Sequence, residues 1–264
     1  MTSELTFHQA QLTSSDIKIR TIHLRDLRHC LREGYADFNE RPSFGFFLAL
    51  IYPLFAVILT VYLLNDSVDH LLYPVVSGFT LLGPIVCVGL FSMSRARGDG
   101  GDPGWRVAFE FVHTSSFAPI LALSLMMMLL YVAWLFMAQF LYTGQFGAFA
   151  PMSFGDLVEQ LFVTRHGLAL LIYGTALGMI FSFAALAVSV VAFPLALDKP
   201  VTAATAIAVS VKAVVANFRV MIAWGMIVIA LLIVGSVPFL IGLGAVLPIL
   251  GHSTWHVYKS IVEN

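Results

Sequence analysis

Long apolar stretches with almost no charged residues are the strongest constraint on this chain. Each is long enough to cross about 30 Å of hydrocarbon as a helix that rises about 1.5 Å per residue. Hydrophobic residues make up 59% of the chain and charged residues only 11%, which is too little charge to solvate a globular surface. The sequence therefore predicts an all-α, polytopic transmembrane helix bundle. The stretches begin near Phe44, Leu71, Phe117, Gly167 and Arg219.

The number of spans depends on the last apolar stretch. Between Arg219 and His252 the chain has no Asp, Glu, Lys or Arg, over about 48 Å of helix, which exceeds one ordinary crossing. The sequence Gly235-Ser236-Val237-Pro238 indicates a turn, so we predict a helical hairpin and six spans in all. A five-span arrangement is the alternative. The predicted spans cover residues 44–64, 71–94, 117–142, 167–193, 213–235 and 238–258.

The distribution of basic residues predicts the orientation. When the six spans are threaded through a bilayer, all Lys and Arg residues except Arg165 fall on one side, and an excess of such residues is typical of the cytoplasmic side. We therefore expect both termini in the cytoplasm. Residues 1–43 then form a cytoplasmic segment with an amphipathic helix, residues 44–258 form the membrane domain, and residues 259–264 form a cytoplasmic tail.

Three segments that precede odd-numbered spans have an amphipathic helical pattern. We expect all three to lie flat at the cytoplasmic interface, with Arg25, Arg28 and Arg32 as interfacial basic residues that attract anionic lipid headgroups. Their apolar faces are Leu27, Leu31, Gly34, Tyr35 and Phe38; Trp105, Ala108, Phe109 and Val112; and Ala204, Ala208, Val211, Val215 and Phe218.

Two weaker patterns concern the packing of the spans. The sequences Gly83-Pro84-Ile85, Phe193-Pro194-Leu195 and Leu247-Pro248-Ile249 recur near the cytoplasmic ends of even-numbered spans, and with the amphipathic segments they suggest a threefold internal repeat. The unequal spacing of these sequences argues against it. Small residues at helical spacing in the fourth span predict close approach of another helix, within the bundle or at an oligomer seam. These residues are Gly174, Gly178, Ser182 and Ala185.

The sequence offers little chemistry at membrane depth. Every Asp, Glu, Lys, Arg and His residue falls at a span end or in a loop, which disfavours ion translocation and a haem–copper core. The chain has no phosphate-binding loop, dinucleotide fingerprint or nucleophile elbow. We therefore expect no catalytic residue, no resident cofactor and no nucleic-acid partner.

One local constellation stands out at the end of the last span. His252 and His256 are four residues apart, so they share a helical face and can contact a metal, a haem or a lipid phosphate. Glu110 or His113 is a candidate third metal ligand. In the alternative interpretation, Trp255 and Tyr258 anchor the helix at headgroup level and the histidines bond to neighbouring loops.

Two stretches of the chain together resemble a known family. They are Asp26-Leu27, Leu31, Gly34 and Asp37-Phe38 near the start, and residues 247–258 near the end. The chain from about Ile17 onward resembles a domain-of-unknown-function family of bacterial six-span inner-membrane proteins, some members of which are labelled as cytochrome c oxidase subunits. The resemblance implies a bacterial inner-membrane location and association with a respiratory complex. It supplies no catalytic residues.

These observations favour a non-enzymatic membrane protein, an accessory, assembly or scaffold component that binds lipids and other membrane proteins, including oxidase subunits. A transporter or channel for a small neutral or lipidic substrate is the alternative. Haem or metal binding at His252 and His256 is a third option. The oligomeric state stays open.

Overall fold

The computed structural model describes residues 11–40, 69–147, 154–237 and 241–263. These residues are mainly helical, and among them the only strand-like pairings are two isolated bridges. The predicted all-α class is confirmed. The elements are α1 (Leu24–Glu40), η1 (Asp69–Leu71), α3 (Leu72–Phe79), η2 (Thr80–Leu82), α4 (Gly83–Gly98), α5 (Trp105–Glu110), η3 (Phe111–His113), α6 (Phe117–Phe146), α7 (Phe154–Val163), α8 (Arg165–Ser189), α9 (Ala192–Asp198), α10 (Ala203–Ala216), α11 (Phe218–Ser236) and α12 (Leu243–Ile261).

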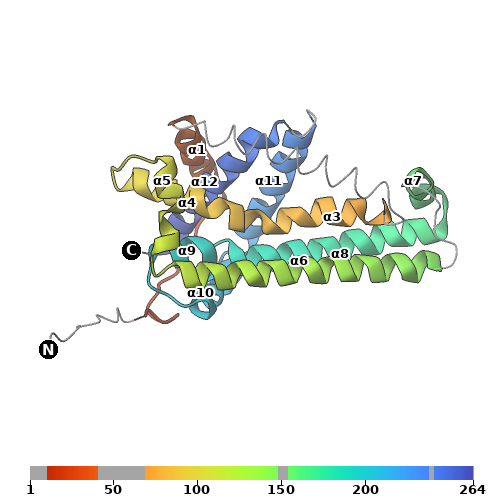
Figure 1. The fold of residues 1–264 in the computed structure, drawn as a ribbon, viewed down its shortest axis with the longest axis horizontal. Helices are drawn as coiled ribbons and strands as arrows, with labels where there is room; N and C mark the ends of the chain where they lie inside the picture. The colour runs from red at the N-terminus through yellow and green to blue at the C-terminus, as the bar shows by residue number, and fades with distance from the viewer. Residues whose placement is uncertain (1–10, 41–68, 148–153, 238–240, 264) are drawn as a thin grey trace.

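The long helices α6 and α8 lie side by side and form the length of the bundle, with α3 and α4 running along them (Figure 1). By length and composition, four segments of the described residues can cross a membrane: Leu72–Gly98, Phe117–Phe146, Arg165–Asp198 and Phe218–Ser236. They correspond to the second to fifth predicted spans. The first predicted span lies outside the described residues, and α12 is not one of the four, so the six-span count stays a prediction.

The outer surface of α6 shows why lipid must cover this bundle. Leu129, Phe136 and Phe140 are 70%, 73% and 70% exposed, on a helix with no charged residue. An apolar surface of this extent is unfavourable in water. On the inner side, the Trp134 ring packs against Gly78 of α3, and its Nε1 donates to the carbonyl of Pro74 over 2.8 Å.

Two of the three recurring prolines coincide with interruptions of their helices. The 3-10 turn η2 directly precedes Gly83-Pro84, and Val190 and Val191 separate α8 from α9 just before Pro194. Proline lacks the N–H that would continue the helical ladder. Pro248 instead lies inside α12. The threefold repeat stays a prediction.

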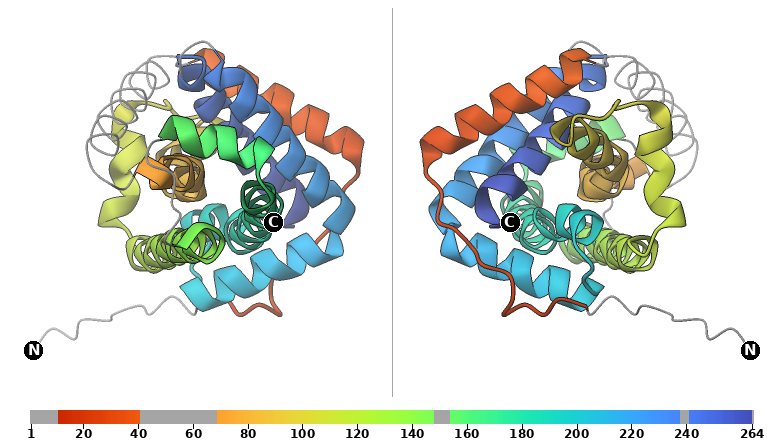
Figure 2. Two further views of the ribbon diagram at one scale, coloured as in Figure 1. Left: turned by 90° about the vertical axis from the view of Figure 1, so that its right-hand side faces the viewer. Right: turned by 90° about the vertical axis from the view of Figure 1, so that its left-hand side faces the viewer.

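The last two helices run across the direction of α6 and α8, as the end-on views of Figure 2 show. They contact each other. Gly235 and Ser236 of the predicted turn are the last residues of α11, and Pro238 lies outside the described residues. The helices α1, α5, α9 and α10 gather toward one end of the bundle, near the carboxyl terminus (Figure 1). Chain segments from the beginning, middle and end of the sequence therefore meet at this end.

The apolar face of helix α1 packs against protein, which differs from the prediction that it enters the lipid interface. Leu27 and Gly34 are buried and α1 packs along α12, so protein covers the face that we expected to enter the lipid interface. Tyr35 is the exception, because it is 53% exposed. The packing is close: a Cβ placed on Gly34 would lie 2.1 Å from Ser253 Oγ and 2.5 Å from the Ser253 backbone nitrogen.

Residues 11–22, which contain no helix, connect the amino-terminal part of the chain to the end of the bundle. Leu12 forms an isolated bridge with Val201, and Ile19 forms one with Val262. The buried side chain of Asn217 fixes the end of this segment, since its Oδ1 accepts from the N–H of Ile22 over 2.8 Å and its Nδ2 donates to the carbonyl of Arg20 over 3.1 Å.

Replacing Asn217 by alanine is therefore expected to loosen residues 11–22. The change leaves the N–H of Ile22 and the carbonyl of Arg20 without their partner, which costs about 1–3 kcal/mol for a buried polar group. Trypsin should then cleave after Lys18 and Arg20 faster than in the wild type. Asn39→Ala, at an exposed site, is the control, and equal cleavage rates for the two variants would contradict this role of Asn217.

Candidate functional site

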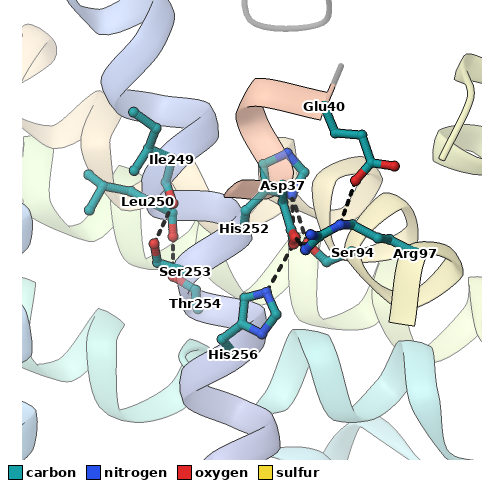
Figure 3. Close-up of polar contacts among 10 residues, drawn as sticks. All are labelled: Asp37, Glu40, Ser94, Arg97, Ile249, Leu250, His252, Ser253, Thr254 and His256. Carbon is teal, nitrogen blue, oxygen red and sulfur yellow. Dashed lines mark hydrogen bonds and ion pairs between the residues drawn. The ribbon is translucent and has the colours of Figure 1, made fainter. Parts of the chain in front are cut away.

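The polar contacts at the gathered end converge on Asp37 (Figure 3). This carboxylate lies near the end of α1 and is only 5% exposed. Its Oδ2 accepts hydrogen bonds from Ser94 Oγ of α4 over 2.5 Å and from His256 Nε2 of α12 over 2.9 Å. Its Oδ1 pairs with Arg97, whose Nε also lies 2.5 Å from Glu40 Oε2. One carboxylate thus joins three helices.

His252 completes this cluster through Ser94. The His252 Nδ1 lies 2.7 Å from Ser94 Oγ and 3.8 Å from Asp37 Oδ2. The hydroxyl of Ser94 has one hydrogen, which it donates to the Asp37 carboxylate, so Nδ1 of His252 must carry the hydrogen of the second bond. The Ser94 contact therefore fixes the tautomer of a residue that is 3% exposed.

The surroundings of Asp37 keep it ionised. Burial by itself would raise the pKa of Asp37, but hydrogen bonds from His256 and Ser94, together with the positive charge of a protonated His256, hold the pKa below its ordinary value of 3.8. At neutral pH the carboxylate therefore carries its full charge opposite Arg97.

A second carboxylate repeats this arrangement from the other side. Asp198, at the end of α9, accepts a hydrogen bond from Tyr258 Oη of α12 over 2.6 Å. Its Oδ2 also lies 3.6 Å from Lys259 Nζ, and its Oδ1 lies 3.8 Å from Arg95 Nε of α4. Asp37 and Asp198 thus each connect α4 to α12, and we refer to the two carboxylates with these partners as the carboxylate clamp.

One family of known proteins matches the segment that contains α4 and α9, the two helices that contribute Ser94, Arg97 and Asp198 to the carboxylate clamp. Residues 72–198 match the profile of a family described as "Predicted integral membrane protein (DUF2189)". This part of the chain is similar to that family. The match confirms the predicted kind of family, one of integral membrane proteins of unknown function. Comparisons with curated proteins and with solved structures found no match.

The DUF2189 segment supplies only part of the carboxylate clamp. Ser94, Arg95, Arg97 and Asp198 lie within it, whereas Asp37 and the histidines of α12 lie outside. Asp37 was not among the predicted site residues. A signal was available, because Asp37 lies three residues after Gly34 on the apolar side of an amphipathic helix, where a carboxylate needs a buried partner.

The residues predicted at the end of α12 meet protein groups. Trp255 and Tyr258 are 4% and 1% exposed, so their rings pack inside the protein and do not reach lipid headgroups. His252 binds Ser94 and His256 binds Asp37. The candidate third ligands are exposed on α5 and η3, and within the described ranges no three His, Cys, Asp or Glu side chains are grouped to hold a metal.

The contacts of Ser94 differ from those of a hydrolytic triad. In a triad, serine donates to histidine and histidine donates to the carboxylate. Here Ser94 donates directly to Asp37, and it is 2% exposed. In the described contacts, this hydroxyl of α4 bonds to Asp37 of α1 and His252 of α12.

The remaining predicted residues are the basic residues of α1 and the small-residue stripe of α8. Arg25, Arg28 and Arg32 are exposed on the outer side of α1, and their contact with lipid headgroups stays a prediction. The small-residue stripe of α8 does not form one continuous contact. Its members differ as follows: Gly178 would place a Cβ 3.5 Å from the Trp134 ring and Gly174 faces open space, while Ala185 is buried and Ser182 is exposed.

Proposed function

We propose that this protein is a non-enzymatic accessory, assembly or scaffold component of a membrane complex. In this proposal it lies in a bacterial inner membrane with both termini in the cytoplasm, and it binds other membrane proteins through the outer face of α1. We further propose, from the sequence resemblance, that a respiratory oxidase is the complex concerned.

The main support for the proposal is that α1 is held in one position against α4 and α12. The carboxylate clamp and the contact between Gly34 and Ser253 hold its inner face against α4 and α12. Its outer face then presents an ordered row of exposed basic residues at a spacing of three to four, Arg25, Arg28 and Arg32. A preorganised surface loses little conformational entropy on binding, which favours association.

The composition of this face suits a protein partner. The side chain of Arg25 is 83% exposed, and Leu24 and Tyr35 are 61% and 53% exposed beside the basic row. Arginine and tyrosine are enriched at protein interfaces. A positive row also favours a partner with an acidic segment, because complementary charge speeds association and excludes other partners.

Site-specific photo-crosslinking in intact membranes tests the proposal. A crosslinking amino acid at Arg28, and a second one at Tyr35, should capture the same membrane protein, identified by mass spectrometry. The triple change R25E/R28E/R32E should lower capture from Tyr35 at least tenfold. A crosslinker at Phe162, which is 71% exposed on α7, is the control position. Equal capture from Phe162, or capture that charge reversal leaves unchanged, would count against the proposal.

A further inference from the structure

The elbow between α10 and α11 combines an outward apolar stripe with two exposed cations. Val211, Val215 and Phe218 are 38%, 69% and 52% exposed, although α10 packs against α8 and α9 through its other side. Lys212 and Arg219 are exposed next to this stripe. Within the part of the chain that the structure describes, neither of these two cations forms an ion pair.

Contacts of Asn217 and Phe218 hold the elbow in a fixed conformation. Asn217 stands at the junction, where it accepts from Ile22 and donates to Arg20 and Ala213 carbonyls. The Phe218 ring meets the ring of Phe183 edge-on, with centroids 5.7 Å apart. These contacts leave Lys212 of α10 and Arg219 of α11 on the two sides of a fixed bend, seven residues apart in the sequence.

The position of the elbow indicates what covers it. Helix α10 begins shortly after the segment Arg165–Asp198, which is long and apolar enough to cross a membrane, and it packs against α8 and α9 of that segment. The ends of such a segment lie where hydrocarbon gives way to headgroups. Apolar side chains at this depth contact acyl chains, and Lys and Arg side chains extend to the phosphate layer.

We propose that the α10–α11 elbow binds an anionic phospholipid, with its phosphate between Lys212 and Arg219 and its acyl chains along Val215 and Phe218. The two cations are complementary to the negative headgroup, and the apolar stripe is complementary to the chains. This inference requires no protein partner, so its failure would leave the proposed function of α1 untouched.

Native mass spectrometry of the purified full chain tests the site with phosphatidylglycerol and phosphatidylcholine of identical acyl chains. The wild type should retain phosphatidylglycerol preferentially. Removing both charges in K212Q/R219Q should weaken phosphatidylglycerol binding about 30-fold, from the loss of two cations near the membrane surface, and leave phosphatidylcholine binding unchanged. Both residues are exposed, so folding should be retained, as circular dichroism can verify.

Two matched variants separate a defined site from diffuse attraction. R106Q/R165Q removes the same charge at two exposed positions away from the elbow and should retain wild-type lipid binding. K212R/R219K preserves both charges and should retain the preference for phosphatidylglycerol. The proposal is overturned by equal losses in R106Q/R165Q and K212Q/R219Q, by unchanged binding in K212Q/R219Q, or by a wild type that does not distinguish the two lipids.

Discussion

Replacing Gly34 by valine is expected to detach α1 from the rest of the molecule. A Cβ at this position would lie 2.1 Å from Ser253 Oγ, 2.5 Å from the Ser253 backbone nitrogen and 2.8 Å from its Cα. Two of these atoms belong to the backbone of α12, so no rotamer change relieves the clash. Overpacking of this kind costs about 1–3 kcal/mol or more, and here the whole cost falls on one helix–helix contact.

The thiol of Cys30 reports whether α1 stays in place. Cys30 is 1% exposed on the inner face of α1, and burial raises its pKa to about 11, so a membrane-impermeant maleimide should label it poorly in the wild type. In Gly34→Val, labelling should approach completion. Gly144→Val is the control, because nothing lies within 4 Å of a Cβ at that glycine. Protection of Cys30 in Gly34→Val would refute the assigned contact.

Replacing Asp37 by alanine should produce the second large effect, a loss of about 3 kcal/mol in the free energy of unfolding. Removing one partner of a buried ion pair leaves the other groups without compensation. Here Arg97, Ser94 and His256 all lose their shared acceptor. For a chain of this size, we expect the melting temperature in detergent to fall by about 6–12 °C. Asp99→Ala, at an exposed site, should shift it little.

The pH dependence of this effect has a definite sign. The pKa of Asp37 is lower in the folded protein than its ordinary value of 3.8, so its contribution to stability is fully present above about pH 4 and is lost as the pH falls through the folded pKa. The difference in melting temperature between wild type and Asp37→Ala should therefore shrink as the pH falls below 4. A difference that stays constant through this range would exclude an ionised Asp37.

The two stretches that carry the family resemblance turn out to contact each other. Gly34 of the first stretch packs on Ser253 of the second, and Asp37 of the first accepts from His256 of the second. The sequence pattern identified both stretches but could not pair them, because Asp37 and His256 are 219 residues apart. The same limit applied to α1, whose apolar face was predicted correctly while its covering by protein was not.

The sequence by itself determined the membrane class, the helical elements and the buried side of α1. These follow from local composition and periodicity, since a run of apolar residues must form a helix in lipid whatever surrounds it. Only the tertiary structure decided which helices the buried carboxylates join. Pairing of Asp37 and Asp198 with α4 and α12 depends on distances of a few ångströms between segments far apart in the chain, and no local pattern encodes such distances.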